Sequence, residues 1–392
     1  MTIAHRISAI LVAAALLPCA AVAQPICRQL DIPGASYTQP FQINNSGQLV
    51  AGSNLGTYVY SAGIWQALPA PPAGSGFTAS NLAGTALNDY GVIGGAAFPD
   101  SGGPEQSYLF AFGQYTFFSY PSSTLVNTEA RGLNNKNQLT VLAFDNSNSL
   151  FGDTAFVYNP LGAPGYPQGY TALAPTLNGR ASTFTIAQQI NDAGQVVGSG
   201  RFPGFGVWSF LYDPAAAQPY TLFRASNGSP TRARGINNRG EIAGAVNAPN
   251  GFSGFFRDAA GDHYFDCPEL NATSIFPTSI NDRGLIAGGT QDSLGTLQHA
   301  FIAYPDAGAV IADLRDAVDT LDESHGIDGR LGEKLEKAAE AFDEGDSARA
   351  CKALASFVAE VAKDSAKQRL PAEQAASFTA EAQAAQRGLG CK

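Results

Sequence analysis

Six asparagines recur along this sequence at regular spacing, five of them inside a short motif of the form Asn-x-x-Gly and one inside Asn-x-x-Asn. One copy lies in QINNSGQLVAG at 42–52, and others read INDAGQVVG, INNRGEIAG and INDRGLIAG. The six are Asn44, Asn88, Asn134, Asn191, Asn237 and Asn281. Side-chain oxygens of this kind could bind calcium or sugar hydroxyls from one face of a fold, or they could hold the chain in a turn.

The residues at the fourth position favour the turn. A type I turn prefers Asn, Asp or Ser at its first position and Gly at its fourth, where the backbone is left-handed. The fourth positions are Gly47, Gly91, Asn137, Gly194, Gly240 and Gly284. Asn137 replaces glycine with the residue that best tolerates that backbone, which a geometric role explains and a chemical role does not. The two middle positions vary, and we expect them to face solvent. A ring of Asx side chains that binds calcium or sugars is the alternative.

Other chemistry-bearing patterns are scarce. The sequence contains no GxSxG, HExxH or P-loop motif, and it therefore nominates no catalytic, cofactor-binding or metal-binding residue. His263, His299 and His325 are scattered, so zinc binding has little support. A pair of catalytic carboxylates for glycoside hydrolysis remains an open alternative, because a closed ring can bring acids together that are distant in the sequence.

The repeated unit predicts a six-bladed β-propeller. The motif asparagines are 44, 46, 57, 46 and 44 residues apart, a period typical of four-stranded blades. The longer step contains the turn-rich segments 159–169 and 176–182. Each copy continues into a short apolar strand and an aromatic strand, and five copies add a further strand. The sixth copy lacks that strand, while ICRQLDIPG at 26–34 stands alone. We expect the N-terminal strand to close the ring; an open array is the alternative.

The composition changes near residue 310. Between 24 and 310, 28 of 287 residues are charged, against 27 of 82 between 311 and 392. The second part has helical spacing, with apolar faces that predict four helices. We therefore predict a β-propeller-like domain at 24–310 and a four-helix module at 311–392.

The first 23 residues have the features of a secretory signal peptide, with cleavage expected before Gln24. The rest of the chain has four cysteines, an even number that suggests two disulfides in an oxidising compartment. Cys351 near the start of the third helix and Cys391 after the fourth would meet in an antiparallel pair. Cys27 then pairs with Cys267 by elimination. We expect a secreted or periplasmic protein with no membrane insertion, because no second long apolar stretch occurs.

The repeats resemble the HAF family of bacterial extracellular repeats, named for a His-Ala-Phe triplet that stands here at 299–301. Residues 326–361 resemble the small helical FIMAH module found at the ends of secreted bacterial proteins. Both resemblances imply a secreted protein without catalysis.

Function is less defined than architecture. The net charge of −10 argues against nucleic acid as a partner. A non-catalytic binding or structural role outside the cell is our first hypothesis, with a glycan or an extracellular protein as partner and no cofactor. A secreted carbohydrate-active hydrolase or lyase is the alternative. Acids gathered at one mouth of the ring would favour the enzyme, and variable turn residues would favour the binder.

Overall fold

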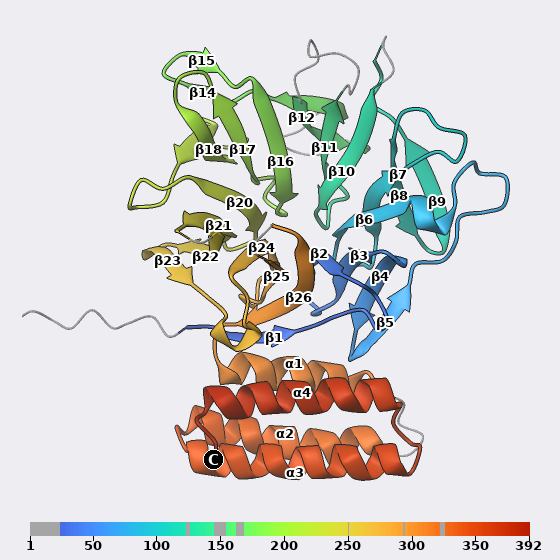
Figure 1. Cartoon of the computed structure of the whole chain (residues 1–392), viewed down its shortest axis with the longest axis vertical. Coiled ribbons are helices and arrows are strands. Elements are labelled where there is room, and N and C mark those ends of the chain that lie inside the picture. The colour runs from blue at the N-terminus through green and yellow to red at the C-terminus, as the bar shows by residue number, and fades with distance from the viewer. Residues whose placement is uncertain are drawn as a thin grey trace, which may run out of the picture.

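The computed structural model describes residues 24–122, 126–144, 154–161, 168–249, 251–292, 295–321 and 326–392. The predicted signal peptide, His325 and residues 162–167 of the segment 159–169 lie outside these described residues. Figure 1 shows a ring of twisted sheets with a bundle of helices against one side.

The ring is a six-bladed propeller of four-stranded antiparallel sheets, as the repeats predict. The first three blades are β2 (Thr38–Ile43), β3 (Leu49–Ser53), β4 (Gly56–Ser61) and β5 (Ile64–Ala67); β6 (Leu82–Leu87), β7 (Ile93–Ala97), β8 (Gln106–Ala111) and β9 (Gln114–Phe118); and β10 (Asn127–Leu133), β11 (Leu139–Phe144), β12 (Thr154–Asn159) and β13 (Gly169–Leu173). The next two are β16 (Phe184–Ile190), β17 (Val196–Phe202), β18 (Gly206–Tyr212) and β19 (Tyr220–Phe223); and β20 (Thr231–Ile236), β21 (Ile242–Ala248), β22 (Gly251–Asp258) and β23 (Gly261–Phe265). A separate hairpin, β14 (Thr176–Leu177) and β15 (Arg180–Ala181), precedes the fourth blade.

The sixth blade joins the two ends of the repeat region. Its strands are β24 (Ser274–Ile280), β25 (Ile286–Gln291) and β26 (Leu297–Tyr304), with β1 (Ile26–Gln29) paired antiparallel to β26. The N-terminal strand therefore closes the ring as predicted, and the open array is excluded. A disulfide between Cys27 and Cys267 ties β1 to the segment after β23, across the boundary between blades six and five.

The innermost strand of every blade carries a β-bulge at the same place. In β2, β6, β10, β16, β20 and β24 the register with the next strand shifts just before the motif asparagine. A bulge bends the strand and turns one side chain away from the alternation of the ladder. The side chains at these bulges face the central channel, which matters for the site described below.

Four helices follow the last blade: α1 (Ala307–Asp319), α2 (Ile327–Asp343), α3 (Ser347–Ala366) and α4 (Ala372–Gly388). Asp306 and Asp346 cap α1 and α3 by accepting backbone N–H bonds from Ala309 and Arg349. The second predicted disulfide joins Cys351 on α3 to Cys391, just beyond α4.

The helices and the propeller share one apolar core. It includes Leu49 and Ile302 from the first and sixth blades and Leu314, Phe357 and Phe378 from the bundle. Helix α4 packs along β1 and β5, the outermost strands of those two blades (Figure 1). The bundle therefore covers the outer edges of two sheets, which would otherwise offer unpaired backbone groups.

A buried ion pair crosses this contact. Arg28 on β1 lies 2.6 Å from the Glu381 carboxylate on α4, and both side chains are almost fully buried. Tyr60 on β4 donates to the same carboxylate at 2.9 Å and accepts from Arg28 at 3.0 Å. Burying a charged side chain costs free energy because it loses its contact with water, and the opposite charge offsets this cost. Removing one partner therefore leaves the other charge buried and uncompensated.

We predict that Arg28→Met lowers the free energy of unfolding by about 3–5 kcal/mol, because it leaves the Glu381 carboxylate buried without its cation. The double variant Arg28→Met/Glu381→Leu should recover most of that loss. The control is Arg349→Met, which removes an exposed pair with Glu344 and should cost no more than about 1 kcal/mol. Urea denaturation measures all three, and equal losses for the single and double variants would contradict this assignment.

Candidate binding site at the open mouth of the propeller

The six motif asparagines form true turns and also link neighbouring blades. In every copy the backbone N–H of the fourth residue donates to the carbonyl oxygen of the asparagine at 3.0–3.2 Å. All six fourth residues have positive φ, Asn137 among them at 58°. Each asparagine side-chain nitrogen also donates to the carbonyl oxygen of the next motif asparagine around the ring, at 2.9–3.2 Å. The last of these bonds runs from Asn281 back to Asn44 and closes the circle.

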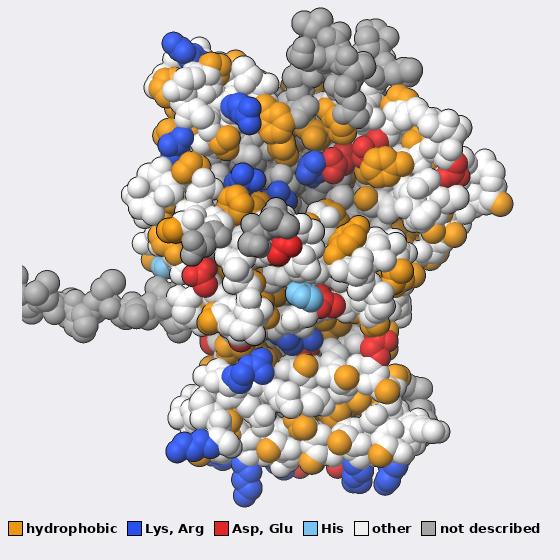
Figure 2. Space-filling model, in the orientation of Figure 1, with side chains coloured by type: hydrophobic (Ala, Val, Ile, Leu, Met, Phe, Trp, Pro, Cys, Tyr) orange, Lys and Arg blue, Asp and Glu red, His pale blue; other side chains and the backbone are white. Residues whose placement is uncertain are grey.

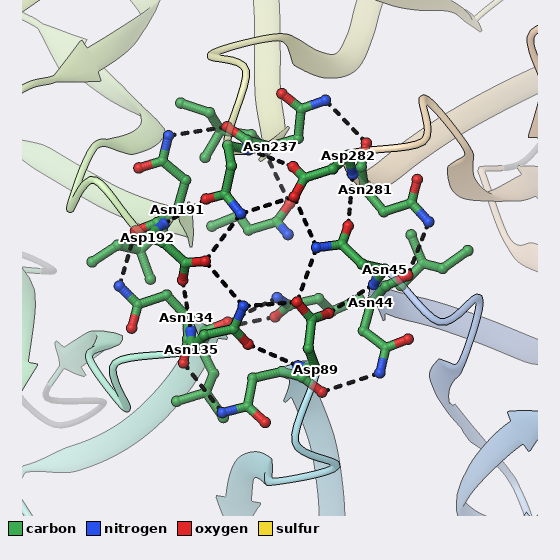
Figure 3. Close-up of a pocket in the computed structure, with 18 of the residues that line it drawn as sticks. Asn44, Asn45, Asp89, Asn134, Asn135, Asn191, Asp192, Asn237, Asn281 and Asp282 are labelled. Atoms are coloured by element: carbon green, nitrogen blue, oxygen red, sulfur yellow. Dashed lines mark hydrogen bonds between the residues drawn. The ribbon is translucent and has the colours of Figure 1, made fainter.

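The residues that follow the motif asparagines form a second, inner circle, which we call the Asx ring. Its members alternate between amide and acid: Asn45, Asp89, Asn135, Asp192, Asn238 and Asp282. Twelve hydrogen bonds of 2.7–3.0 Å connect them (Figure 3). Each amide nitrogen donates to the two flanking carboxylates, and each backbone N–H donates to the next side chain. Only about 40 Å³ of free space remains at this end of the channel.

The Asx ring corrects one expectation from the sequence. The first middle position of the motif is only partly exposed in five of the six copies, and its side chain is held in the ring by hydrogen bonds, because closure of the ring places six such side chains around one axis. A donor must then meet an acceptor at every step, which fixes the alternation. The second middle position is exposed in five of the six copies, as expected.

The channel behind the Asx ring is filled by two glutamines. Gln42 in the first blade donates to the carbonyl oxygen of Leu133 in the third at 3.0 Å. Gln189 in the fourth blade accepts from the backbone N–H of Ile236 in the fifth at 3.1 Å. Gly132 allows the innermost strands of the third and fourth blades to approach closely, since a Cβ there would lie 2.4 Å from the backbone carbonyl oxygen of Gln188. These side chains form a floor between the two ends of the channel.

The opposite mouth is open and is lined by the bulge residues. One residue from each blade, three positions before the motif asparagine, faces a cavity of about 320 Å³. These residues are Phe41, Thr85, Arg131, Gln188, Arg234 and Thr278. The two arginines flank Gln188, so the third, fourth and fifth blades form a basic side. The sixth, first and second blades contribute two threonines and a phenylalanine.

Arg234, on the fifth blade, is one of the two cations of this basic side. Its guanidinium lies 4.3 Å from the centre of the Phe276 ring and makes no hydrogen bond or ion pair with any described residue. Burial, together with repulsion from Arg131 and Arg232, lowers the pKa of Arg234 to about 9. Glu129 acts in the opposite direction but forms its ion pair with Arg131, so the Arg234 guanidinium stays charged at pH 7 without an ion pair of its own.

A second cavity of about 440 Å³ continues from the first along the fourth and fifth blades, and the two share Gln188 and Arg234. It adds Arg201, Arg224 and Arg232, so five arginines line the two cavities. The predicted propeller domain has only 11 basic residues in all. Basic side chains gather near the middle of the propeller in Figure 2, next to acidic ones. This is a local positive surface on an acidic protein.

One carboxylate, Glu129, lines the first cavity and lies 2.7 Å from Arg131. Glu105 is buried near it and its carboxyl group forms no hydrogen bond with the described residues. Burial and the neighbouring Glu129 raise the pKa of Glu105 to about 8, while Arg131 acts in the opposite direction. With its pKa raised, the carboxyl group of Glu105 stays largely protonated at pH 7 behind the cavity wall, and arginines dominate the charge of the mouth.

The other sequence candidates lie elsewhere. His263 on the outermost strand β23 pairs with Asp258 at 3.0 Å, and His299 on β26 pairs with Asp31 at 2.8 Å. No group of three or more potential metal-ligating His, Cys, Asp or Glu side chains was found in the described part of the chain. No helix among the described residues is long and apolar enough to cross a membrane.

Sequence reasoning missed the mouth residues, although a signal was present. The residue three positions before the motif asparagine is, in order along the six copies, Phe, Thr, Arg, Gln, Arg and Thr. In a plain strand these side chains would follow the alternation of their neighbours. Because the bulge recurs in every innermost strand, the same position instead lines one mouth in all six blades.

Comparisons with known proteins find only distant similarity to solved structures. No protein-family model and no curated protein matches the sequence. Solved structures that this chain matches include TolB from Acinetobacter baumannii, at 11% identity and a TM-score of 0.40 over 69% of this chain and 54% of that one. The present chain thus covers about half the length of that protein. An alpha-L-arabinanase from Penicillium chrysogenum, solved with arabinobiose, shares 14% identity at a TM-score of 0.41 over 71% and 96%. An alpha-L-arabinofuranosidase from Fusarium graminearum shares 11% at 0.39, over 71% and 96%.

We predict that Asn135→Asp lowers the free energy of unfolding at pH 7 by about 3 kcal/mol or more. The change removes two N–H donors from Asp89 and Asp192 and adds a third carboxylate between them. Part of the loss should return at pH 4, where carboxylates begin to take up protons. Ala193→Asp adds the same charge at an exposed position of a neighbouring turn and should change stability by only about 0.5 kcal/mol. Similar losses for both variants would show that the Asx ring contributes little.

We also predict that Glu105→Gln stabilises the protein at pH 9 by about 4–5 kcal/mol and leaves it unchanged at pH 4. Below the ordinary pKa of a glutamic acid, the side chain is protonated in both states. As the pH rises towards 8, the unfolded chain loses the proton first, and stability falls until the folded protein also releases it. Urea denaturation at the two pH values tests this. A gain of equal size at both would contradict it.

Proposed function

We propose that this is a non-catalytic binding protein that acts outside the cytoplasm and takes its ligand in the open mouth of the propeller. The observation that carries the proposal is the contrast between the two ends of one channel. The Asx ring closes one end with internal hydrogen bonds. The other end is hollow, and its Arg234 guanidinium forms no hydrogen bond or ion pair with the described residues.

The setting supports a binding role outside the cell. Both disulfides fit an oxidising compartment, where the resemblance to HAF repeats and to the FIMAH module also points. The mouth has the size and mixed lining of a ligand pocket, with polar groups converging on a hollow. The Gln188 side chain forms no hydrogen bond with the described residues and is available to a ligand. We propose that the helical module stabilises the propeller rim, since it packs against β1 and β5 far from the mouth.

The hydrolase or lyase alternative has weaker support. A glycosidase of the usual kind needs two carboxyl groups facing the sugar. Glu129 is the acid that lines the first cavity, and it is paired with Arg131. Glu105 lies behind it and is not among the residues that line the cavity. On the sequence alone, acids gathered at one mouth would favour an enzyme. Among the described residues, such a gathering occurs only in the closed Asx ring, where every carboxylate already accepts hydrogen bonds from its neighbours.

Blocking each mouth in turn tests the proposal. Gln188→Trp should fill the open mouth and abolish binding to a broad glycan array, whereas Ala193→Trp, exposed at the closed mouth, should leave binding intact. Circular dichroism and thermal unfolding would show that both variants are folded. Binding that survives Gln188→Trp and disappears with Ala193→Trp would place the ligand at the closed mouth and contradict the proposal. Release of shortened sugars from any bound glycan would favour the enzyme.

A further inference from the structure

We infer that the ligand of the open mouth is an acidic saccharide, held by its carboxylates between Arg131 and Arg234. The inference rests on the proposed function, since it assigns a chemical class to the ligand of the same mouth. It depends on three features of the cavity: two arginines with free donors, neutral hydrogen-bonding groups around them, and aromatic rings that hold the cations in place.

The two arginines have unused donors that point to an anion. Arg131 gives one terminal nitrogen to Glu129, and its Nε is buried without a hydrogen-bond partner. Arg234 uses none of its five N–H groups in a hydrogen bond within the described structure. A guanidinium presents paired N–H groups in a plane, and a carboxylate accepts both at once. A carboxylate placed between them would supply the missing acceptors and relieve the repulsion between the two cations.

Aromatic contacts position the cations. The guanidinium of Arg234 stacks on Phe276 at 4.3 Å, and that of Arg232 on Phe252 at 4.7 Å. Arg224 likewise lies 4.7 Å from the Trp208 ring. A stacked guanidinium keeps its edge free for hydrogen bonds while its face is covered. The basic side of the mouth is therefore arranged before any ligand arrives.

The neutral groups favour a saccharide over other anions. Gln39, Gln188 and Thr278 line the first cavity beside the arginines, and they can donate to or accept from hydroxyl groups. Phe41 offers an apolar surface on the opposite side. The two cavities together could hold a molecule longer than a single small anion. The remaining surface is acidic, so a long nucleic acid would be repelled away from the mouth.

Isothermal titration calorimetry on the whole chain tests the inference with matched probes. The probes are a tetrasaccharide of galacturonate, a tetrasaccharide of mannuronate, and the fully methyl-esterified galacturonate tetrasaccharide, whose carboxylates are masked. A tetraglutamate peptide and inorganic phosphate represent other sources of negative charge. We expect at least one uronate probe to bind and its methyl ester to bind at least tenfold more weakly. We also expect the peptide and phosphate to bind more weakly than the uronate.

Variants locate the binding. Arg234→Gln should weaken uronate binding at least tenfold, and Arg131→Gln should also weaken it. Arg239→Gln removes one positive charge from the exposed turn at the closed mouth and should change affinity less than twofold. Equal unfolding temperatures for Arg234→Gln and the unmodified protein would exclude misfolding as the cause.

Each contrary outcome has a distinct meaning. Equal binding of the esterified probe, lost in Gln188→Trp, would overturn the acidic class and leave the proposed mouth in place. Tighter binding of the peptide would overturn the saccharide in favour of an acidic protein partner. Uronate binding unaffected by Arg234→Gln and by Gln188→Trp would overturn both proposals. Failure of every uronate probe to bind at millimolar concentration would overturn the inference.

Discussion

The structure depends on one bond repeated six times: the side-chain nitrogen of a motif asparagine donates to the carbonyl oxygen of the next. A turn alone would accept aspartate or serine at this position. Only asparagine has a short side chain whose oxygen accepts backbone N–H bonds within its own turn and whose nitrogen can donate to the neighbouring blade. This dual demand explains why all six copies have the amide, and it sets each blade at a fixed angle to the next.

The Asx ring extends the same constraint to the next residue. An amide and a carboxylate can alternate around six blades without a mismatch, because six is even. A ring of five or seven blades would bring two like residues together, either two donors or two carboxylates. The carboxylates Asp89, Asp192 and Asp282 are stable near one another because each accepts bonds from two amide side chains. The polar side chains at this end of the channel are therefore used in hydrogen bonds between blades.

Much of this architecture could be predicted from the sequence, since local geometry determined it. The period of the repeats indicated the blades, the unpaired segment 26–34 indicated closure, and Asn137 identified the left-handed turn position. Cys351 and Cys391 could be paired because helix lengths fixed their separation. The role of Asn45 could not be predicted, because its partners are 44 and 237 residues away and meet it only when the ring closes. The mouth was missed for a similar reason: Arg131 and Arg234 belong to different blades, and only the repeated bulge turns both towards the axis.

A division of labour between the two ends of the channel is the central claim of this account. Its most direct test is a crystal structure of the protein grown with the uronate tetrasaccharide that binds most tightly in solution. The account predicts a sugar carboxylate between Arg131 and Arg234, with the Asx ring unchanged at the far end. Sugar bound on the Asx ring, or between the outer strands of two blades with the mouth empty, would contradict it.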